Sequence, residues 1–388
     1  MNRSGEILNK IAHLRAANSA NWGSVIRRAL TLSRDYERDD GFSGRLVNIT
    51  LETTYRCNLN CGFCFLQGNR LNRRDEELTL AEIASLADQA GRLGSSIYIT
   101  GGEPFLRKDG VEIVETIKSA GVKTGVNTNA TLLDDAKIGR LARTGMDYAI
   151  ISLHGSAEYH DKVVGKAGSR EKAVRAIKSM LKAGGGTHVL VNFVLTEEST
   201  SHLAEVTELC AKTGVHALTV QHLTFLTRGD IEAHGHAWPG IFGAADDTGL
   251  VYSMVDPSNV DRAAILEAAE KCKELAGKLG VCCIIKPDLD SEMLEAWYSE
   301  DYGVRSRCLY PWTDARVAPD GQVYACQFIP YPVGNIRQAS LKELLNNERY
   351  RKFRKGLKEA GGQFPGCARC CKLYRGGLKS AGRNRKRD

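Results

Sequence analysis

The residues of this chain best suited to chemistry are its cysteines, of which there are 12. Three of them, Cys57, Cys61 and Cys64, have the spacing C-x-x-x-C-x-x-C on one predicted loop. A structural zinc site would need a fourth Cys or His ligand, and none follows nearby in the sequence. An iron–sulfur cube held by three cysteines instead keeps one iron open. The spacing therefore indicates a reactive metal centre rather than three unrelated core thiols.

A second set of cysteines lies near the C-terminus. Cys308 and Cys326 flank a predicted hairpin, and Cys367 and Cys370 follow as a C-x-x-C pair, with Cys371 as an alternative or free member. Two thiolate pairs suit one closed metal site, for which zinc and an iron–sulfur cluster fit equally well from the spacing alone. The remaining cysteines fall in helix or strand patterns, which indicates core thiols: Cys210, Cys272, Cys282 and Cys283.

The elements that must position these cysteines alternate between strand and helix. Apolar or β-branched runs predict strands at 47–53, 96–100, 122–127, 148–153, 188–195 and 217–223. Helical periodicity predicts helices at 79–94, 110–120, 132–144, 169–183, 199–213 and 258–280. Thr79 with Glu82 predicts a capping box, and Ser258 is the predicted N-cap of the last helix. Such strand–helix units predict an α/β fold with parallel strands and with chemistry at their C-terminal ends.

The chain divides into five predicted parts. They are an N-terminal helical segment (1–45), a core of strand–helix units whose sheet curls into a barrel or lies open (46–257), a linking helix and strand (258–300), a smaller cysteine-bearing domain (301–373) and a basic flexible tail (374–388). The N-terminal helix is basic between its apolar positions, which fits packing on the domain, capping of the substrate or contact with a membrane surface. The polar stretch 228–257 predicts a loop that closes over the active site.

Composition and charge exclude several classes of protein. The 388 residues are 43% hydrophobic and 26% charged, which is ordinary for a soluble globular chain. No uncharged apolar run of about 18 residues occurs, and no secretory signal is evident, so we expect a cytoplasmic protein. The net charge of +7 comes from 53 basic and 46 acidic residues, so most charges are balanced and the net charge selects no partner by itself. The basic tail is typical of a solvated run, so nucleic acid is not an expected partner.

The first cysteine motif resembles that of the radical S-adenosylmethionine (SAM) superfamily, C-x-x-x-C-x-aromatic-C, with Phe63 at the aromatic position. The resemblance implies a partial (β/α)6 radical SAM barrel. It also implies a catalytic [4Fe-4S] cluster on Cys57, Cys61 and Cys64, with the amino and carboxylate groups of SAM on the fourth iron.

Segments at the following strand ends also resemble that superfamily. Gly101, Gly102 and Glu103 match the segment that receives the methionine ammonium, where paired glycines let backbone approach a ligand closely. The usual glycine after Asn129 is Ala130 here. The positions matched to SAM binding are Phe63, Gly101, Gly102, Glu103, Asn129, Ser152, Arg170, Asn192 and Val194. The candidate substrate contacts are Asn127, His154, Gln221 and His222, where His154 replaces a common Asp and is either a core residue or a catalytic one.

The second cysteine set resembles the twitch form of the SPASM extension found on radical SAM enzymes, with Gly321 between the first two cysteines. The resemblance implies a small domain with a β-hairpin and a helix. It also implies one auxiliary [4Fe-4S] cluster on Cys308, Cys326, Cys367 and Cys370 that relays electrons.

The predicted function follows from both resemblances. A radical SAM enzyme cleaves SAM reductively to a 5′-deoxyadenosyl radical, which here abstracts hydrogen from a C–H bond of a small-molecule biosynthetic intermediate. Modification of a ribosomal peptide, or of a lipid or terpenoid, is an alternative. The expected electron donor is of flavodoxin or ferredoxin type. A zinc-bearing nucleic-acid binder is a further hypothesis, against which the three-cysteine motif and the GGEP segment both weigh.

Overall fold

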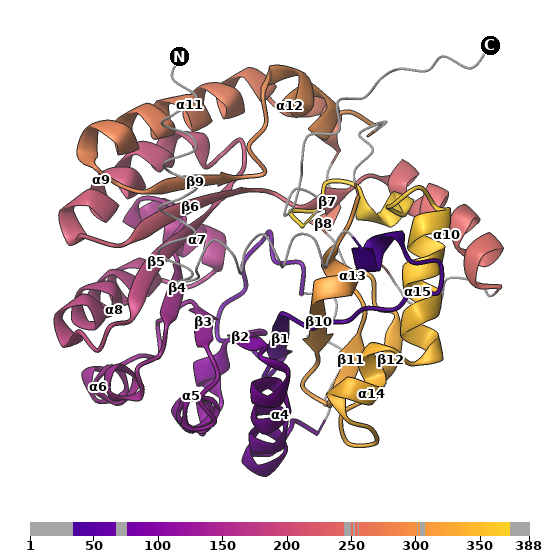
Figure 1. Cartoon of the computed structure of the whole chain (residues 1–388). Helices are drawn as coiled ribbons and strands as arrows, with labels where there is room; N and C mark the ends of the chain where they lie inside the picture. The colour runs from indigo at the N-terminus through magenta and orange to yellow at the C-terminus, as the bar shows by residue number, and fades with distance from the viewer. Residues whose placement is uncertain are drawn as a thin grey trace.

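Ten strands form one sheet in the order β12-β11-β10-β1-β2-β3-β4-β5-β6-β9 in the computed structural model (Figure 1). The structure describes residues 34–66, 76–243, 250, 253–254, 256–300, 302 and 307–372. From β1 to the edge strand β9, neighbouring strands of the sheet pair in parallel. These strands are β1 (Asn48–Glu52), β2 (Ser96–Thr100), β3 (Thr124–Thr128), β4 (Tyr148–Ser152), β5 (His188–Leu195), β6 (Ala217–His222) and β9 (Cys283–Lys286). The predicted partial barrel is thereby confirmed.

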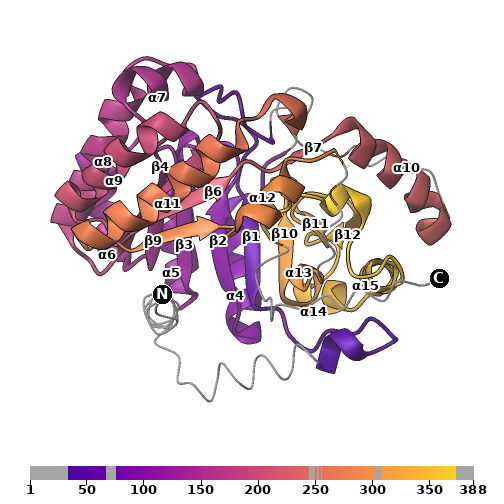
Figure 2. The ribbon, with the colours of Figure 1, turned by 90° about the horizontal axis from the view of Figure 1, so that it is seen from above.

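Helices cover the outer side of the curled sheet, as Figures 1 and 2 show. They are α4 (Leu80–Leu93), α5 (Gly110–Ser119), α6 (Asp135–Thr144), α7 (Ala157–Val164), α8 (Ser169–Ala183), α9 (Leu203–Thr213) and α11 (Arg262–Leu279). Short 3-10 turns are η1 (Pro104–Leu106), η2 (Thr200–His202), η3 (Pro257–Asn259) and η4 (Pro365–Cys367). The helix α7 was not predicted from the sequence, although Ser156 caps its first turn through Tyr159 N.

The two faces of the sheet differ in burial because side chains alternate along each strand. In β4 and β5, every second residue is fully buried under the outer helices, and the residues between them are only half-buried. Ile151, Val191 and Phe193 represent the buried set, each at most 1% exposed. The half-buried set faces the inside of the curl.

Helix termini follow local capping chemistry. The capping box of Thr79 and Glu82 is confirmed, with the Thr79 hydroxyl and the Glu82 carboxylate each accepting a backbone N–H of the other residue. The predicted N-cap Ser258 is wrong. It lies within η3, and α11 starts four residues later with Asp261 as its N-cap. Asp256 binds Ser258 N instead, so a turn precedes the helix.

The stretch predicted as a loop from residue 228 begins with a helix, α10 (Arg228–Phe242). Thr227 and Asp230 form a capping box at its start. The buried residues Asp230, His234, Trp238 and Phe242 repeat every fourth position, which is the stripe of a helix with one packed face. The capping box and the four-residue spacing of the buried residues are the sequence signals that indicate this helix, despite its polar composition.

The C-terminal elements extend the same sheet beyond β1. β10 (Asp314–Val317) pairs in parallel with β1, and β11 (Gln322–Tyr324) and β12 (Pro332–Asn335) follow as antiparallel strands. The predicted hairpin at Asp320 and Gly321 therefore joins β10 to β11. The C-terminal half also contains the helices α12 (Ser291–Trp297), α13 (Tyr310–Thr313), α14 (Leu341–Leu345) and α15 (Glu348–Glu359). The strands β7 (Phe225–Leu226) and β8 (Ser253–Met254) form a separate pair.

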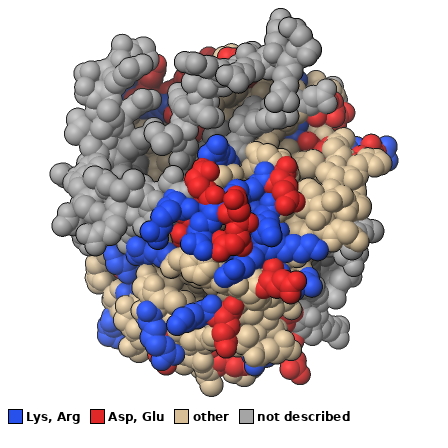
Figure 3. Space-filling view, turned by 45° about the vertical axis from the view of Figure 1, so that its right-hand side comes forward, with Lys and Arg blue, Asp and Glu red and all other residues tan. Residues whose placement is uncertain are grey.

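Two predicted segments lie largely or wholly outside the described residues. These are most of the N-terminal helical segment, with its membrane-surface hypothesis, and the basic tail. Among the residues that the structure describes, no helix has both the length and the apolar character needed to cross a membrane. Figure 3 shows a face on which basic and acidic side chains intermingle.

Candidate active site

The first cysteine loop leaves the C-terminal end of β1 and is held from the side by α7. Asn60 N donates to Val164 O at 2.9 Å, and Gly62 N donates to Val163 O at 3.1 Å. A further bond from Cys64 N to Cys61 O, at 3.1 Å, closes a turn between two of the cysteines. All three cysteines are only partly buried. The loop thus presents three thiols from a backbone that is itself hydrogen-bonded.

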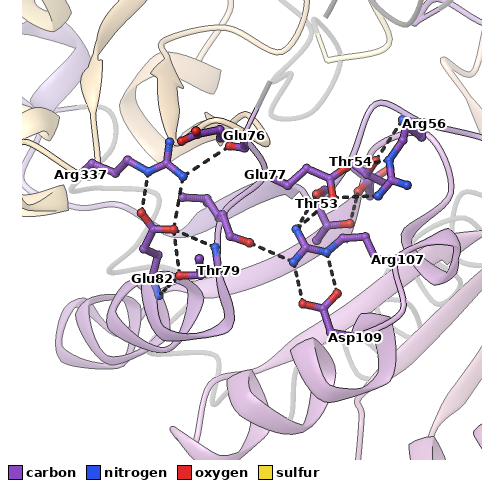
Figure 4. A network of polar contacts seen from close by, with 12 residues as sticks. Thr53, Thr54, Arg56, Glu76, Glu77, Thr79, Glu82, Arg107, Asp109 and Arg337 are labelled. Carbon is purple, nitrogen blue, oxygen red and sulfur yellow. Dashed lines mark hydrogen bonds and ion pairs between the residues drawn. The ribbon is translucent and has the colours of Figure 1, made fainter. Parts of the chain in front are cut away.

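An arginine network fixes the stem of this loop (Figure 4). Arg107 donates to Thr53 O at 3.1 Å and to Leu78 O at 2.9 Å, and Asp109 binds the same guanidinium. Arg56, next to the first cysteine, forms an ion pair with Glu77 at 2.9 Å. The stem is therefore anchored to the segment that leads into α4.

Gly101 and Gly102 are needed for contact between two backbones. A Cβ atom on Gly102 would lie 2.1 Å from Arg56 O, and one on Gly101 would lie 2.3 Å from Thr54 O. Gly102 N and Glu103 N donate to the same two carbonyls, at 2.7 and 2.9 Å. The close approach that the sequence suggested is thus made to the stem of the cysteine loop.

Glu103 is fully buried and joins the ends of β2 and β3. Its carboxylate accepts from Thr128 Oγ1 at 2.7 Å, Asn129 N at 2.8 Å and Phe105 N at 3.1 Å. Burial raises the pKa of Glu103 to about 7, because desolvation outweighs the effect of these donors. Its oxygens therefore hold protein groups in this structure.

Asn129 lies directly beside the cysteine loop. Its Nδ2 donates to Asn58 Oδ1 at 3.0 Å and lies 3.9 Å from Cys57 Sγ. Ala130, where the family has glycine, adopts φ +58°. This left-handed backbone explains the usual glycine and is rare for alanine. Asn58, which no sequence motif pointed to, also donates from its Nδ2 to Thr131 Oγ1 at 2.8 Å.

Five candidate residues share the inner face of the sheet. In the parallel register, Ser152 lies opposite Asn192, and Val194 lies opposite Gln221. Asn127 lies opposite Ile150, which is two residues before Ser152 and therefore points to the same side of the sheet. All five candidates are half-buried. The structure therefore brings together Asn127, Ser152, Asn192, Val194 and Gln221.

His154 packs against the cysteine loop and is hydrogen-bonded to β5. Its ring lies 4.8 Å from that of Phe63 in an edge contact, and its Nδ1 accepts from Val194 N at 3.3 Å. Burial lowers the pKa of His154 to about 3, so the ring is neutral near pH 7 and carries its proton on Nε2. Because it is only 3% exposed, we interpret it as a positioning residue.

Arg170 and His222 are placed differently from the shared inner face. Arg170 donates to Gly155 O at 2.8 Å and pairs with Glu205, so it holds the turn after β4. His222 is 2% exposed, and burial lowers its pKa to about 4. Its ring faces Trp297 with the centroids 6.2 Å apart. Neither side chain belongs to the set of five residues on the inner face of the sheet.

The auxiliary cysteines come together from three segments. Cys308, Cys367 and Cys370 are each at most 7% exposed, and Cys326 is partly buried. Burial raises the pKa of Cys308 to about 12, with a further contribution from Cys326. Burial likewise raises the pKa of Cys367, with smaller contributions from Cys326 and Cys308. The thiol of Cys371 is hydrogen-bonded to that of Cys370, which leaves the choice between these two open.

The donor atoms of both cysteine sets are thiol sulfurs. Backbone N–H groups two residues later donate to the sulfurs of Cys57, Cys326 and Cys370 at 3.4 to 3.5 Å, which stabilises their thiolate forms. Within the described ranges, no three His, Cys, Asp or Glu side chains converge closely enough for one metal ion. Cysteine thiolates are the usual ligands of iron–sulfur clusters, so the donor atoms of both sets fit such clusters.

The two cysteine loops touch each other. Phe65, next to Cys64, lies edge-on to Phe328, two residues after Cys326, with ring centroids 5.3 Å apart. Tyr55, Leu66, Ala318 and Tyr324 form a small buried cluster at the same junction. Beneath it, Arg316 pairs with Glu52 at 3.2 Å, with both side chains at most 4% exposed.

Comparison with known proteins agrees with this geometry. The model of the radical SAM superfamily matches residues 51–210, and that of an iron–sulfur cluster-binding (SPASM) domain matches residues 308–371. The pre-heme d1 synthase of Dinoroseobacter shibae is 24% identical over 72% of this chain and 75% of its own length. The AdoMet-dependent heme synthase of Methanosarcina barkeri is 28% identical over 79% of this chain and 84% of its own.

A solved structure has the same fold. Streptococcus suis SuiB bound to its precursor peptide SuiA superposes with a TM-score of 0.60 at 17% identity, covering 87% of this chain and 73% of that one. Several further curated relatives are matched over only 44% to 56% of their own length.

The glycine contact predicts a selective loss of metal. Because a Cβ on Gly102 would enter the backbone of Arg56, Gly102→Ala should displace the first cysteine loop and leave the auxiliary site intact. We expect iron content to fall to that of Cys57→Ala, as measured by metal analysis of anaerobically purified protein. Gly277→Ala is the control, since a Cβ there meets nothing within 4 Å. Full iron content in Gly102→Ala would contradict the argument.

Glu103 predicts a pH-dependent stability. Its pKa is raised from 4.5 to about 7 in the folded protein, so its contribution to stability is lost as the pH rises through that range. Relative to wild type, Glu103→Gln should therefore gain stability between about pH 4.5 and 7, by at most roughly 3 kcal/mol. Chemical denaturation at several pH values measures this, with the exposed Glu158→Gln as baseline. A difference that is constant with pH would exclude the proposed titration.

Proposed function

Because the chain is a radical SAM enzyme with a SPASM-type iron–sulfur domain, we propose that it abstracts a hydrogen atom from a C–H bond of a small-molecule biosynthetic intermediate. When bound, a reduced [4Fe-4S] cluster supplies the electron that cleaves SAM to a 5′-deoxyadenosyl radical. In this proposal Cys57, Cys61 and Cys64 hold that cluster.

The shared inner face of the sheet carries the proposal. Ser152, Asn192 and Val194 would contact SAM there, and Asn127 and Gln221 would face the substrate. Strand side chains are held rigidly by the backbone ladder, so both molecules would be oriented by the same scaffold. A primary alkyl radical attacks whatever lies nearest, which makes such orientation the main task of the protein.

The auxiliary site is assigned to electron relay. Cys308, Cys326, Cys367 and Cys370 give a four-thiolate set without an open position, which suits electron transfer better than substrate binding. The contact of Phe65 with Phe328 brings the two cysteine loops together, as a relay requires. A flavodoxin- or ferredoxin-type protein is the electron donor that this chemistry needs.

The substrate class we favour is a tetrapyrrole. Two relatives that align with most of this chain are named for heme and pre-heme d1 synthesis. Half-buried amides such as Asn127 and Gln221 are suitable hydrogen-bond donors for carboxylate side chains of a macrocycle. The likeness to SuiB with its peptide concerns the fold, and a peptide substrate is the second candidate.

The radical chemistry is tested by product formation. Anaerobic incubation with SAM and dithionite should yield 5′-deoxyadenosine, quantified by chromatography. Cys57→Ala should lower the yield by more than about 100-fold, since a lost ligand leaves the cluster unbound. Cys210→Ala removes a buried thiol of α9 and should retain activity. Equal yields from wild type and Cys57→Ala would exclude the assigned cluster.

The substrate class is tested by binding. We expect Fe-coproporphyrin III to bind at about micromolar concentration, seen as a shift of its Soret band. Gln221→Ala should weaken binding about tenfold, roughly 1.4 kcal/mol. Asn48→Ala changes a half-buried residue of β1 at the other end of the strands and is the matched control. If protein that forms 5′-deoxyadenosine did not bind Fe-coproporphyrin III, a tetrapyrrole substrate would be excluded. The proposed radical chemistry would be unaffected.

A further inference from the structure

Two thiols outside both cysteine sites lie close enough to react with each other. Cys272 Sγ in α11 is 3.6 Å from Cys283 Sγ, at the first residue of β9. Cys272 is 2% exposed, whereas Cys283 is only partly buried. The sequence predicts unrelated core thiols here, but the fold of α11 back onto β9 brings the two together.

The pair is remote from the proposed active site. Cys283 pairs with Leu218 near the start of β6, whereas Gln221 lies toward the C-terminal end of the same strand. In Figures 1 and 2, α11 and β9 run beside each other at the edge of the sheet that is opposite β10–β12. This pair is therefore not part of either cluster-binding set.

A chain of hydrogen bonds makes the two thiols unequal. Thr207 Oγ1 donates its one proton to Leu203 O at 2.8 Å and also lies 3.4 Å from Cys272 Sγ. Since that proton is already used, Cys272 can donate to the Thr207 oxygen and Cys283 can donate to Cys272. The bond from Cys283 lowers the pKa of Cys272, and the same bond raises that of Cys283. Cys272 is thus the member inclined toward the thiolate, which is the form that can attack a mixed disulfide on Cys283.

We propose that Cys272 and Cys283 form a reversible disulfide, with a low-molecular-weight disulfide such as glutathione disulfide as the oxidant. The more exposed Cys283 first forms a mixed disulfide, as the oxidant's S–S bond breaks and one thiol leaves. Cys272 then attacks Cys283 Sγ, the new S–S bond forms and the second thiol leaves. Two electrons pass from the cysteines to the oxidant, and the two cysteine protons leave with the two thiols.

The required movement is small. The sulfurs must approach from 3.6 Å to about 2.05 Å. The connection between α11 and β9 contains Gly280, which has a left-handed backbone and open space around it, since an added Cβ would have nothing within 4 Å. The disulfide would fasten the edge strand β9, which pairs with β6 alone among the described strands, to α11. Oxidation should therefore slow amide hydrogen exchange in Cys283–Lys286.

The test uses the full chain with its clusters loaded, under anaerobic conditions. The protein is equilibrated in buffers of reduced and oxidised glutathione, alkylated, digested and mapped by mass spectrometry. We expect a cross-link between the peptides carrying Cys272 and Cys283 to form in oxidising buffer and to disappear in reducing buffer. Hydrogen exchange at β9 should slow at least about tenfold in the oxidised form.

Three variants complete the test. Cys283→Ser and Cys272→Ala should each abolish the cross-link and the change in exchange, and Cys282→Ser, which alters the neighbouring thiol, should retain both. Wild-type mapping needs no variant, so a poorly folded variant does not obscure the result. A cross-link through Cys282, a mixed glutathione disulfide alone, or full alkylation of both cysteines in oxidising buffer would each overturn the proposal.

Discussion

The parallel pairing of β1 with β2 on one side and β10 on the other is the constraint on which the rest of the structure depends. The first cysteine loop leaves the end of β1, and the hairpin that follows β10 leads to Cys326. Because one strand serves both neighbours, the two loops lie side by side and Phe65 reaches Phe328. The spacing of the two sites is thus determined by the backbone hydrogen bonds between neighbouring strands.

Buried polar groups secure this junction at two levels. Arg316 of β10 pairs with Glu52 of β1, and Tyr55 donates to the same carboxylate at 3.2 Å. Removing one member of such a pair leaves a buried charge without its partner, at a cost of about 3 to 5 kcal/mol. At the next strand end, Glu103 gathers donors from β3 and from η1. These contacts join the ends of β1, β2, β3 and β10, where the proposed SAM and substrate positions begin.

The sequence was sufficient where local chemistry decides the outcome. The strand–helix order, the capping box at Thr79 and the hairpin at Gly321 depend on nearby residues, and all three agree with the structure. It was insufficient where distant segments meet. Three contacts join residues that are far apart in the sequence or lie across a turn. They are the bonds from the cysteine loop to the carbonyls of α7, the ion pair of Glu52 with Arg316, and the approach of Cys272 to Cys283. The helix α10 was missed because polar composition outweighed its four-residue stripe.

We propose that the first cysteine loop holds an iron–sulfur cluster with one iron open to SAM. The most direct measurement is electron paramagnetic resonance of the reduced Cys308→Ala/Cys326→Ala/Cys367→Ala variant, in which only the first site can be loaded, before and after SAM is added. The account predicts about four irons per chain and a [4Fe-4S]⁺ signal whose shape changes when SAM binds. A signal that SAM leaves unchanged, or stoichiometric zinc in place of iron, would contradict it.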